Sequence, residues 1–202
     1  MAQTEVRDVT VVLGDLRDFT RVSSEMEPLD VAAMLNEYYS HVTAAVFEQD
    51  GFLDKFVGDA MMAVFSAPFE QPDHAIRAIR TAKSVKSRLA TLNATRQHRG
   101  QQPLSCGFGI HTGPAALGHV GGAERSNYTV IGTTVNLASR IEGHSRDGEI
   151  LISEAVLGCL NGEHETKLFG RVALRGAPGL HSLHQIVFAT DNCEGRDVAE
   201  HI

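Results

Sequence analysis

Two aspartates stand where carboxylates could bind a metal ion. Asp15 directly follows an apolar run, in GDLRDFT, and Asp59 lies between two apolar runs, in DKFVGDAMMAVF. If these runs are strands of one sheet, their ends can meet and both carboxylates can face one point. Hard oxygen ligands of this kind hold Mg²⁺ or Mn²⁺ beside a nucleotide. Taken singly, each aspartate is more typical of a turn or a helix cap.

A second candidate cluster lies in YTVIGTTVNLASRIEG, residues 128–143. Asn136 and Arg140 are four positions apart in a predicted helix, so their side chains share one face. Arginine presents a rigid fork of donors that fits phosphate, and asparagine can both donate and accept hydrogen bonds. The pair suits the ribose and phosphate of a nucleotide, although a solvated helix face explains the pair alone more simply.

The hydrophobic pattern predicts the elements that position these residues. Short apolar or alternating runs indicate strands, and apolar residues at three- and four-residue steps indicate helices. The predicted strands cover residues 9–13, 52–56, 60–65, 105–111, 128–131, 150–153, 168–174 and 183–188. The predicted helices cover residues 29–49, 134–143 and the segment that follows Asp73, a predicted N-cap, up to Arg99.

The opening order of strand, helix, strand, strand, helix, strand is that of a ferredoxin-like split βαβ arrangement. We therefore expect an α+β fold with a ferredoxin-like βαββαβ core, an antiparallel sheet and additional C-terminal strands. Helices on one face of the sheet would leave the other face partly open for a partner. The glycine-rich stretch 113–122 lacks the ending of a Walker loop and predicts a tight hairpin.

The composition describes one globular domain. The chain has 202 residues, of which 43% are hydrophobic, and no linker rich in Pro, Gly or Ser divides it. We expect a linker over residues 1–8, the folded domain over residues 9–190 and a polar tail over residues 191–202. The formal net charge of −7 argues against nucleic-acid binding, which needs a basic face.

The location of the chain is predicted from its cysteines and its hydropathy. Cys106, Cys159 and Cys193 are odd in number and match no zinc or CxxC spacing, which indicates unpaired thiols in a reducing compartment. No apolar run reaches the length of a membrane span, and the first residues do not resemble a signal peptide. We expect a cytoplasmic domain, whose parent protein could itself be membrane-anchored.

Four segments in register give a more specific indication than any one of them. GDLRDFT, DKFVGDAMMAVF, GIHTGP and YTVIGTTVNLASRIE occur in the order and approximate spacing of the class III nucleotidyl cyclase catalytic domain. The chain resembles this family from about Val9 to Phe188. The resemblance implies an adenylate cyclase that converts ATP into cyclic AMP and pyrophosphate by intramolecular phosphoryl transfer. It also implies two divalent cations, Mg²⁺ or Mn²⁺, and sites shared between the chains of a homodimer.

The resemblance assigns roles to the metal-binding and base-reading positions. Asp15 and Asp59 match the two metal-binding aspartates, with the Leu16 carbonyl as a further ligand. Lys55 matches the position that reads the purine, where lysine goes with adenine and glutamate with guanine. Thr129 matches its partner position, where Asp or Thr goes with adenine. A lysine donor and a hydroxyl acceptor complement adenine N1 and N6.

The remaining assignments concern the ribose and the phosphates. By resemblance, Asn136 and Arg140 position the ribose and stabilise the transition state. Arg125 falls near a basic position that contacts the phosphates. Arg175 stands where the family usually has a lysine that reaches the terminal phosphates, and arginine keeps the charge but changes the geometry.

One position departs from the family pattern at the metal site. Asp18 stands where the family usually has glycine, and its carboxylate could weaken substrate binding or alter the metal preference. Two alternatives to an adenylate cyclase remain: a guanylate cyclase, against which Lys55 argues, and a degenerate nucleotide-binding or dimerisation module. The resemblance further implies a regulatory domain upstream of this chain in the parent protein.

Overall fold

The computed structural model describes residues 4–122 and 124–188, so the predicted polar tail and Cys193 lie outside the described residues. The elements follow one another as β1 (Glu5–Leu16), α1 (Phe19–Ser24), α2 (Pro28–Phe47), β2 (Phe52–Val57), β3 (Ala60–Phe65), α3 (His74–His98), β4 (Cys106–Gly121), β5 (Ser126–Ile131), α4 (Thr133–Glu142), β6 (Ile150–Ser153), α5 (Glu154–Leu157), β7 (Thr166–Ala173) and β8 (Leu180–Ile186). Every predicted strand and helix is present, whereas the short helices α1 and α5 were not predicted.

Eight strands form a single sheet in the order β2-β3-β1-β4-β6-β8-β7, with β5 paired to β4. The first four strands pair antiparallel in the ferredoxin-like order, which confirms the predicted α+β core. One pair departs from the expected antiparallel sheet, because β6 lies parallel to β4. The chain reaches β6 through the crossover helix α4, and parallel neighbours require such a connection.

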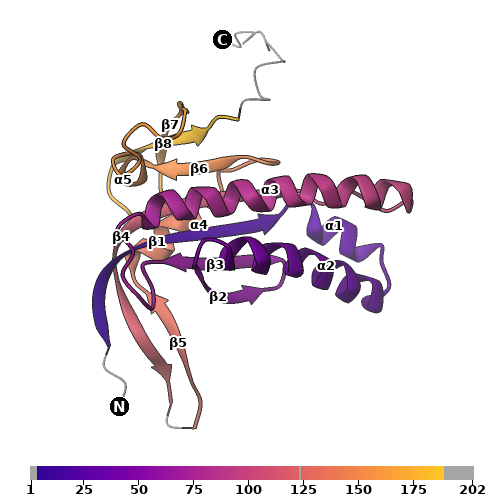
Figure 1. The fold of residues 1–202 in the computed structure, drawn as a ribbon, viewed down its shortest axis with the longest axis horizontal. Helices are drawn as coiled ribbons and strands as arrows, with labels where there is room; N and C mark the ends of the chain where they lie inside the picture. Colours follow the sequence, from indigo (N-terminus) through magenta and orange to yellow (C-terminus); the bar gives the residue numbers. More distant parts are fainter. Residues whose placement is uncertain (1–3, 123, 189–202) are drawn as a thin grey trace.

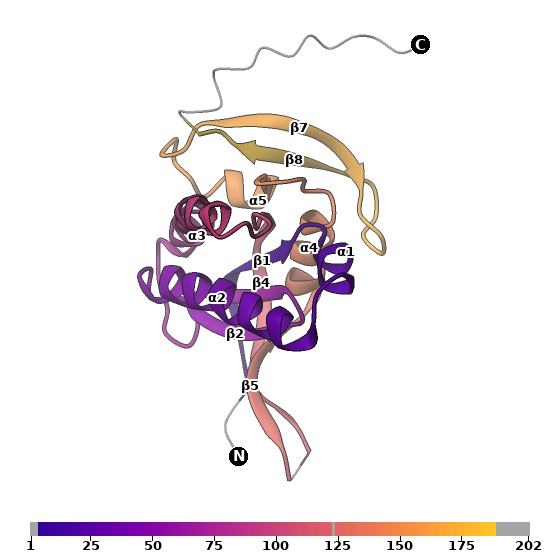
Figure 2. The same cartoon turned by 90° about the vertical axis from the view of Figure 1, so that its right-hand side faces the viewer.

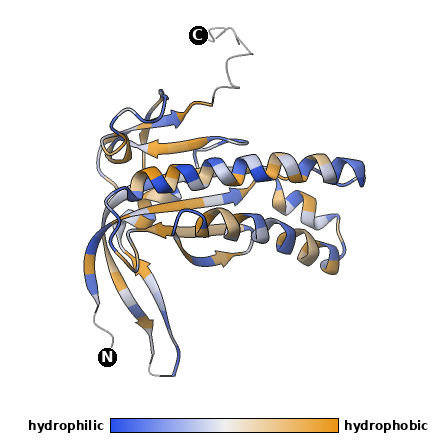
Figure 3. Cartoon of the chain, in the orientation of Figure 1, coloured by the Kyte–Doolittle hydropathy of each residue, from blue (hydrophilic) through white to orange (hydrophobic). Residues whose placement is uncertain are grey.

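Helices α2 and α3 lie side by side against one face of the sheet, as Figure 2 shows. The apolar stripe of α3 is buried as the periodicity predicted, and it comprises Ile76, Ile79, Ala82, Val85 and Leu89. Asp73 takes the N-cap position, but its side chain makes no capping hydrogen bond and accepts one from Arg77 instead. In Figure 3 the hydrophobic colours concentrate on the central strands and on the helix surfaces that face them.

Helix α4 covers part of the opposite face, so the expectation of helices on one face only is wrong. Ala138 and Ile141 of α4 are fully buried against strand residues of that face. Gly109 of β4 permits this contact, because an added Cβ would overlap the backbone nitrogen of Glu142. The close approach of helix and strand therefore depends on a residue without a side chain.

Residues 113–121 of the glycine-rich stretch belong to a strand, and the predicted tight hairpin there is wrong. Strand β4 runs through it and pairs with β1 from Leu16 opposite Cys106 to Glu5 opposite Leu117. Continuous pairing to a neighbour fixes an extended backbone that local glycine content does not reveal. The actual turn follows Gly121, and the β4–β5 hairpin projects from the body of the domain (Figure 1).

The same pairing changes the start of the domain. Strand β1 begins at Glu5 rather than at Val9, so residues 5–8 belong to the sheet instead of a linker. None of the helices in the described part of the chain combines the length and apolarity that a membrane crossing requires. Cys106 is buried and Cys159 is exposed, and both are free thiols.

Candidate active site

Asp15 and Asp59 are brought together as the sequence predicted. Asp15 lies near the end of β1 and Asp59 in the turn between β2 and β3, and both line a cavity of about 620 Å³. Leu16 lines the same cavity, while its side chain is buried in the core under α2 and α3. Burial and the negative charge of Asp15 raise the pKa of Asp59 to about 6.

Two carboxylates that line one cavity form a donor set that suits a divalent cation. Neither aspartate forms an ion pair with a lysine or arginine among the described residues. A bound cation would remove the repulsion that favours the protonated form. The described residues hold no cluster of three or more His, Cys, Asp or Glu side chains. Backbone and substrate oxygens would therefore complete the coordination.

The turn that carries Asp59 is fixed by its neighbours. Gly58 has a φ of 59°, in the left-handed region that favours glycine, and lets the chain reverse between Val57 and Ala60. Tyr39 of α2 stacks on Phe56 with ring centroids 3.9 Å apart, and its hydroxyl donates to the Gly58 carbonyl. Helix α2 thus sets the position of the Asp59 backbone.

Asp18 occupies a backbone position that explains the glycine usual in the family. Its φ is 57°, and aspartate is among the few side-chain-bearing residues that tolerate this left-handed conformation. The side chain is 73% exposed, and its carboxylate lies 3.7 Å from the Arg21 guanidinium. The additional negative charge is therefore turned toward solvent and partly offset by Arg21.

Arg17, which the sequence analysis did not single out, ties the end of β1 to the end of α4. Its Nη2 donates to the Glu142 carboxylate and to the Ser145 hydroxyl, both at 2.6 Å. Gly107 makes room for this guanidinium, because an added Cβ would overlap it. The candidate metal site is thereby anchored to the helix that carries Asn136 and Arg140.

Lys55 and Thr129 are in direct contact, although they belong to different strands. The Lys55 ammonium donates to the Thr129 hydroxyl at 3.1 Å, and this hydroxyl donates to Asp54 Oδ2 at 3.0 Å. Asp54 Oδ2 also lies 3.0 Å from the Lys55 Nζ. The base-reading pair predicted from the sequence is thus assembled within one chain, with Asp54 as an unpredicted third member.

A β-bulge explains why Asp54 was missed. Strict alternation along a strand places neighbouring side chains on opposite faces, so Asp54 would point away from Lys55. The register of β2 against β3 shifts between Leu53 and Lys55, and Asp54 is the extra residue. A bulge re-aims side chains in this way, and only cross-strand pairing reveals it.

Asn136 and Arg140 lie on the side of α4 that faces away from the sheet. Asn136 is exposed and Arg140 is half-buried. The Arg140 guanidinium lies 3.3 Å from the place of an added Cβ on Gly176, in the loop between β7 and β8. Arg175 is adjacent in this loop and exposed, so the fold brings both arginines into one neighbourhood.

Arg125 is not brought to the other candidate residues in this way. It is exposed in the turn before β5, at the projecting end of the β4–β5 hairpin (Figure 1). Among the predicted site residues, a hydrogen bond joins Lys55 to Thr129, and the carboxylates of Asp15 and Asp59 interact with each other. The predicted residues thus fall into a pair of aspartates, a Lys55–Thr129 pair and a pair on α4, and Arg17 ties the end of α4 to the end of β1.

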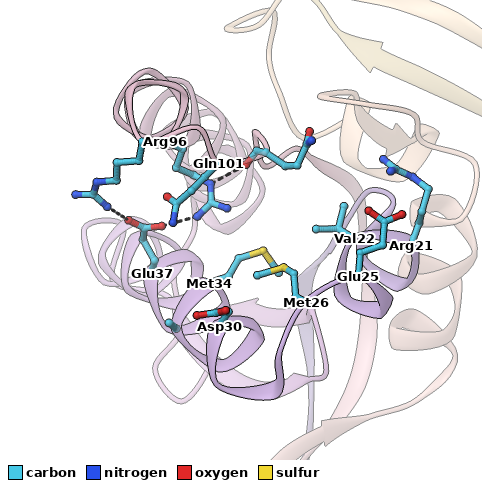
Figure 4. A pocket seen from close by; sticks show the side chains of 12 residues that line it. Arg21, Val22, Glu25, Met26, Asp30, Met34, Glu37, Arg96 and Gln101 are labelled. Atoms are coloured by element: carbon cyan, nitrogen blue, oxygen red, sulfur yellow. Dashed lines mark hydrogen bonds and ion pairs between the residues drawn. The ribbon is translucent and has the colours of Figure 1, made fainter.

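A different cavity, of about 520 Å³, lies between α1, α2 and the end of α3 (Figure 4). Met26 and Met34 lie side by side in it, and Arg96 forms an ion pair of 2.7 Å with Glu37 at its edge. It contains none of the predicted site residues. It borders the metal site through Arg21, which lines both cavities.

Residues 1–188 match the family described as the adenylate and guanylate cyclase catalytic domain. The chain belongs to this family. The match covers nearly the whole cyclase domain and includes all three groups of candidate site residues. The resemblance predicted from four short segments is thus confirmed.

The curated relatives of this cyclase domain include two adenylate cyclases. It is 35% identical to adenylate cyclase 1 of Rhizobium meliloti (strain 1021), over 90% of this chain and 28% of the relative. It is 36% identical to an adenylate cyclase of Anabaena cylindrica, over 75% of this chain and 30% of the relative. The chain therefore spans less than a third of these curated relatives.

Solved structures agree with the fold along nearly its full length. The adenylyl cyclase CyaB from P. aeruginosa is 32% identical with a TM-score of 0.89, and the match covers 93% of this chain and 97% of that one. The guanylyl cyclase Cya2 is 31% identical with a TM-score of 0.85, over 90% and 92% of the two chains. Overall similarity to these structures thus does not distinguish an adenylyl from a guanylyl cyclase.

Proposed function

We propose that this cyclase domain is an adenylate cyclase that converts ATP into 3′,5′-cyclic AMP and pyrophosphate. The contact between Lys55 and Thr129 carries the choice of purine. Adenine presents an acceptor at N1 and a donor at N6, which complement a lysine ammonium and a hydroxyl oxygen. Guanine presents a donor at N1, which would be mismatched with the Lys55 ammonium.

The reaction is an intramolecular phosphoryl transfer. The ribose 3′-oxygen attacks the α-phosphorus in line, a new P–O bond forms, and the bond to the leaving pyrophosphate breaks. Two divalent cations, Mg²⁺ or Mn²⁺, held by Asp15, Asp59 and the Leu16 carbonyl, would lower the pKa of the 3′-hydroxyl and neutralise the phosphates. Asp15 or a water on the substrate accepts the 3′-proton.

The remaining polar residues bind and orient the substrate. Asn136 holds the ribose, and Arg140 offsets the charge that develops on the α-phosphate. Arg175 lies in the loop beside the Arg140 guanidinium and would reach the terminal phosphates. Arg125, on the projecting hairpin, would contact the phosphates from a second chain.

The proposed assembly is a homodimer with two sites. One chain supplies Asp15 and Asp59, and the other supplies Lys55, Thr129, Asn136 and Arg140. The contact of Lys55 with Thr129 forms within one chain, so a single chain can supply both base-reading residues to a site. We further propose a cytoplasmic location and an upstream regulatory domain that reorients the two chains.

The test is a comparison of both nucleotides in one assay. The purified chain is incubated with ATP or GTP and Mn²⁺, and the initial rates of cyclic nucleotide formation are measured. Cyclic AMP formation at a clearly higher kcat/KM is expected, and Asp15→Ala serves as the inactive control. A preference for GTP would instead make the chain a guanylate cyclase. Binding of ATP without turnover would make it a nucleotide-binding module.

A further inference from the structure

Asp54 is a buried carboxylate that the reaction described above does not use. Its side chain is 0% exposed. Its Oδ2 accepts the hydrogen bond from Thr129, whereas its Oδ1 is buried without a hydrogen-bond partner among the described residues. A buried carboxylate is costly unless it is paired, so its position between the two base-reading residues requires an explanation.

The hydrogen bonds of this cluster fix the direction of the Thr129 hydroxyl. A hydroxyl has one hydrogen and two lone pairs. The hydrogen of Thr129 is donated to Asp54, and one lone pair accepts from Lys55. What remains for a ligand is an acceptor only. Thr129 can then accept from the 6-amino group of adenine, but it has no hydrogen to donate to the 6-carbonyl of guanine.

We propose that Asp54 is a specificity-determining residue that acts through Thr129, by committing its hydroxyl hydrogen and so making it an acceptor toward the purine. This inference rests on the proposed adenylate cyclase function. Without Asp54 the hydroxyl rotates freely and can donate to guanine as readily as it accepts from adenine. A Thr129 with an unconstrained hydroxyl would therefore be a weak selector.

The bulge in β2 is the structural device that makes this possible. It places Asp54 and Lys55, adjacent in sequence, within reach of the same Thr129 hydroxyl. The Lys55 side chain is 46% exposed, and its ammonium keeps a hydrogen for the purine N1 while it pairs with Asp54. The Thr129 hydroxyl thus offers a hydrogen-bond acceptor to the purine, and the neighbouring Lys55 ammonium offers a donor.

The decisive variant is Asp54→Leu, which has a similar size and no acceptor. We expect the ratio of kcat/KM for ATP over GTP to fall about tenfold, because one polar mismatch against guanine is removed. Asp54→Asn is the matched control, since it removes the charge but keeps an oxygen that accepts from Thr129. It should keep most of the ATP preference. Equal loss of preference in both variants would show that only the charge beside Lys55 matters and would overturn the proposal.

A double-mutant cycle tests whether Asp54 acts through Thr129. In a Thr129→Val background there is no hydroxyl to orient, so Asp54→Leu should leave the ATP-to-GTP ratio unchanged. A merely structural Asp54 would lower both rates together in either background. If Asp54→Leu fails to fold, as judged by thermal melting, Asp54→Ala removes the acceptor without added bulk and is used in its place.

Nucleotide binding separates this inference from the cyclase activity. Displacement of a fluorescent ATP analogue by ATP or GTP is measured with Ca²⁺, so that turnover is suppressed. A chain that makes no cyclic nucleotide, but binds ATP better than GTP and loses that preference with Asp54→Leu, contradicts the proposed activity and supports the role of Asp54. An unmodified chain that binds both equally contradicts the role of Asp54.

Discussion

Two aspartate clusters of this domain are held in opposite ways. Asp54 is fully buried, and Lys55 and Thr129 bind its carboxylate within the same chain. Asp59 shares a cavity with Asp15, and burial and the charge of its neighbour raise its pKa to about 6. Folding pairs Oδ2 of Asp54 and leaves its Oδ1 without a hydrogen-bond partner among the described residues, whereas Asp15 and Asp59 retain a repulsion between their carboxylates.

The two clusters differ because recognising a base and binding cations make different demands on a carboxylate. A cluster that recognises a base by hydrogen-bond polarity works best when its donors and acceptors are fixed before the ligand arrives. A cluster that binds divalent cations needs an excess of negative charge, which lowers the stability of the metal-free protein. With the proposed roles, the repulsion therefore lies at the candidate metal site, and the pre-organised donors and acceptors lie at the predicted base-reading site.

The largest effect on activity is expected when one carboxylate is removed from the candidate metal site. Asp15→Ala or Asp59→Ala should reduce cyclic AMP formation about a thousandfold or more, because the cations would lose a ligand that no other described side chain replaces. Initial rates with Mn²⁺ measure the effect. Asp18→Gly is the control, since its carboxylate is exposed and its left-handed backbone favours glycine. Near-normal activity of either alanine variant contradicts the metal assignment.

Rebuilding the base-reading cluster should exchange the substrate. In Lys55→Glu with Thr129→Gly, glutamate accepts from guanine N1–H and its 2-amino group, and glycine makes room for the carbonyl. The ATP-to-GTP ratio of kcat/KM should change by roughly a hundredfold, since two mismatches of about 1–3 kcal/mol each are reversed. If the double variant keeps the ATP preference of the unmodified chain, the base is recognised elsewhere.

The hydrogen bonds of Arg17 join the end of β1 to the end of α4. Removing them tests how much they stabilise the folded domain. Arg17→Ala removes both 2.6 Å hydrogen bonds and leaves the half-buried Glu142 without its ion pair. We expect a loss of about 2 kcal/mol in the free energy of unfolding, which lowers Tm by about 4–8 °C in a domain of this size. Arg80→Ala, which removes an exposed ion pair with Glu163, is the control. Equal Tm values for the two variants would show that the Arg17 hydrogen bonds do not stabilise the domain.

The smallest expected effect is a change in melting temperature that follows from the raised pKa of Asp59. A pKa raised from 3.8 to about 6 means that the metal-free folded protein loses stability as pH rises through that range. Asp59→Asn should therefore melt a few degrees higher than the unmodified chain at pH 7.5 in chelator. The difference should vanish below about pH 4, where both states of the unmodified chain are protonated. A variant that is less stable at pH 7.5 would contradict the repulsion.

The sequence predicts the parts of the site that local patterns determine. The contact of Lys55 with Thr129 and the meeting of Asp15 with Asp59 follow from motifs in register, and the structure contains both. Features that depend on pairing between distant segments were missed. The bulge at Asp54 requires the register of β2 against β3.

The glycine-rich part of β4 shows the same limit. Local glycine content indicated a turn, but pairing with β1 makes residues 113–121 a strand. Arg17 was passed over because its partners, Glu142 and Ser145, are more than a hundred residues away in the chain. Such contacts exist only once α4 has packed on Gly109.

The central claim, that each site is completed by two chains, has a direct test. We expect Asp59→Ala chains and Arg140→Ala chains each to be inactive. The two are mixed in equal amounts under conditions in which the exchange of chains between dimers has been demonstrated. Half of the dimers are then mixed, and each has one site with both lesions and one with neither. We expect about a quarter of the activity of the unmodified chain to return. A mixture that stays as inactive as its parents, despite exchange, would contradict the shared site.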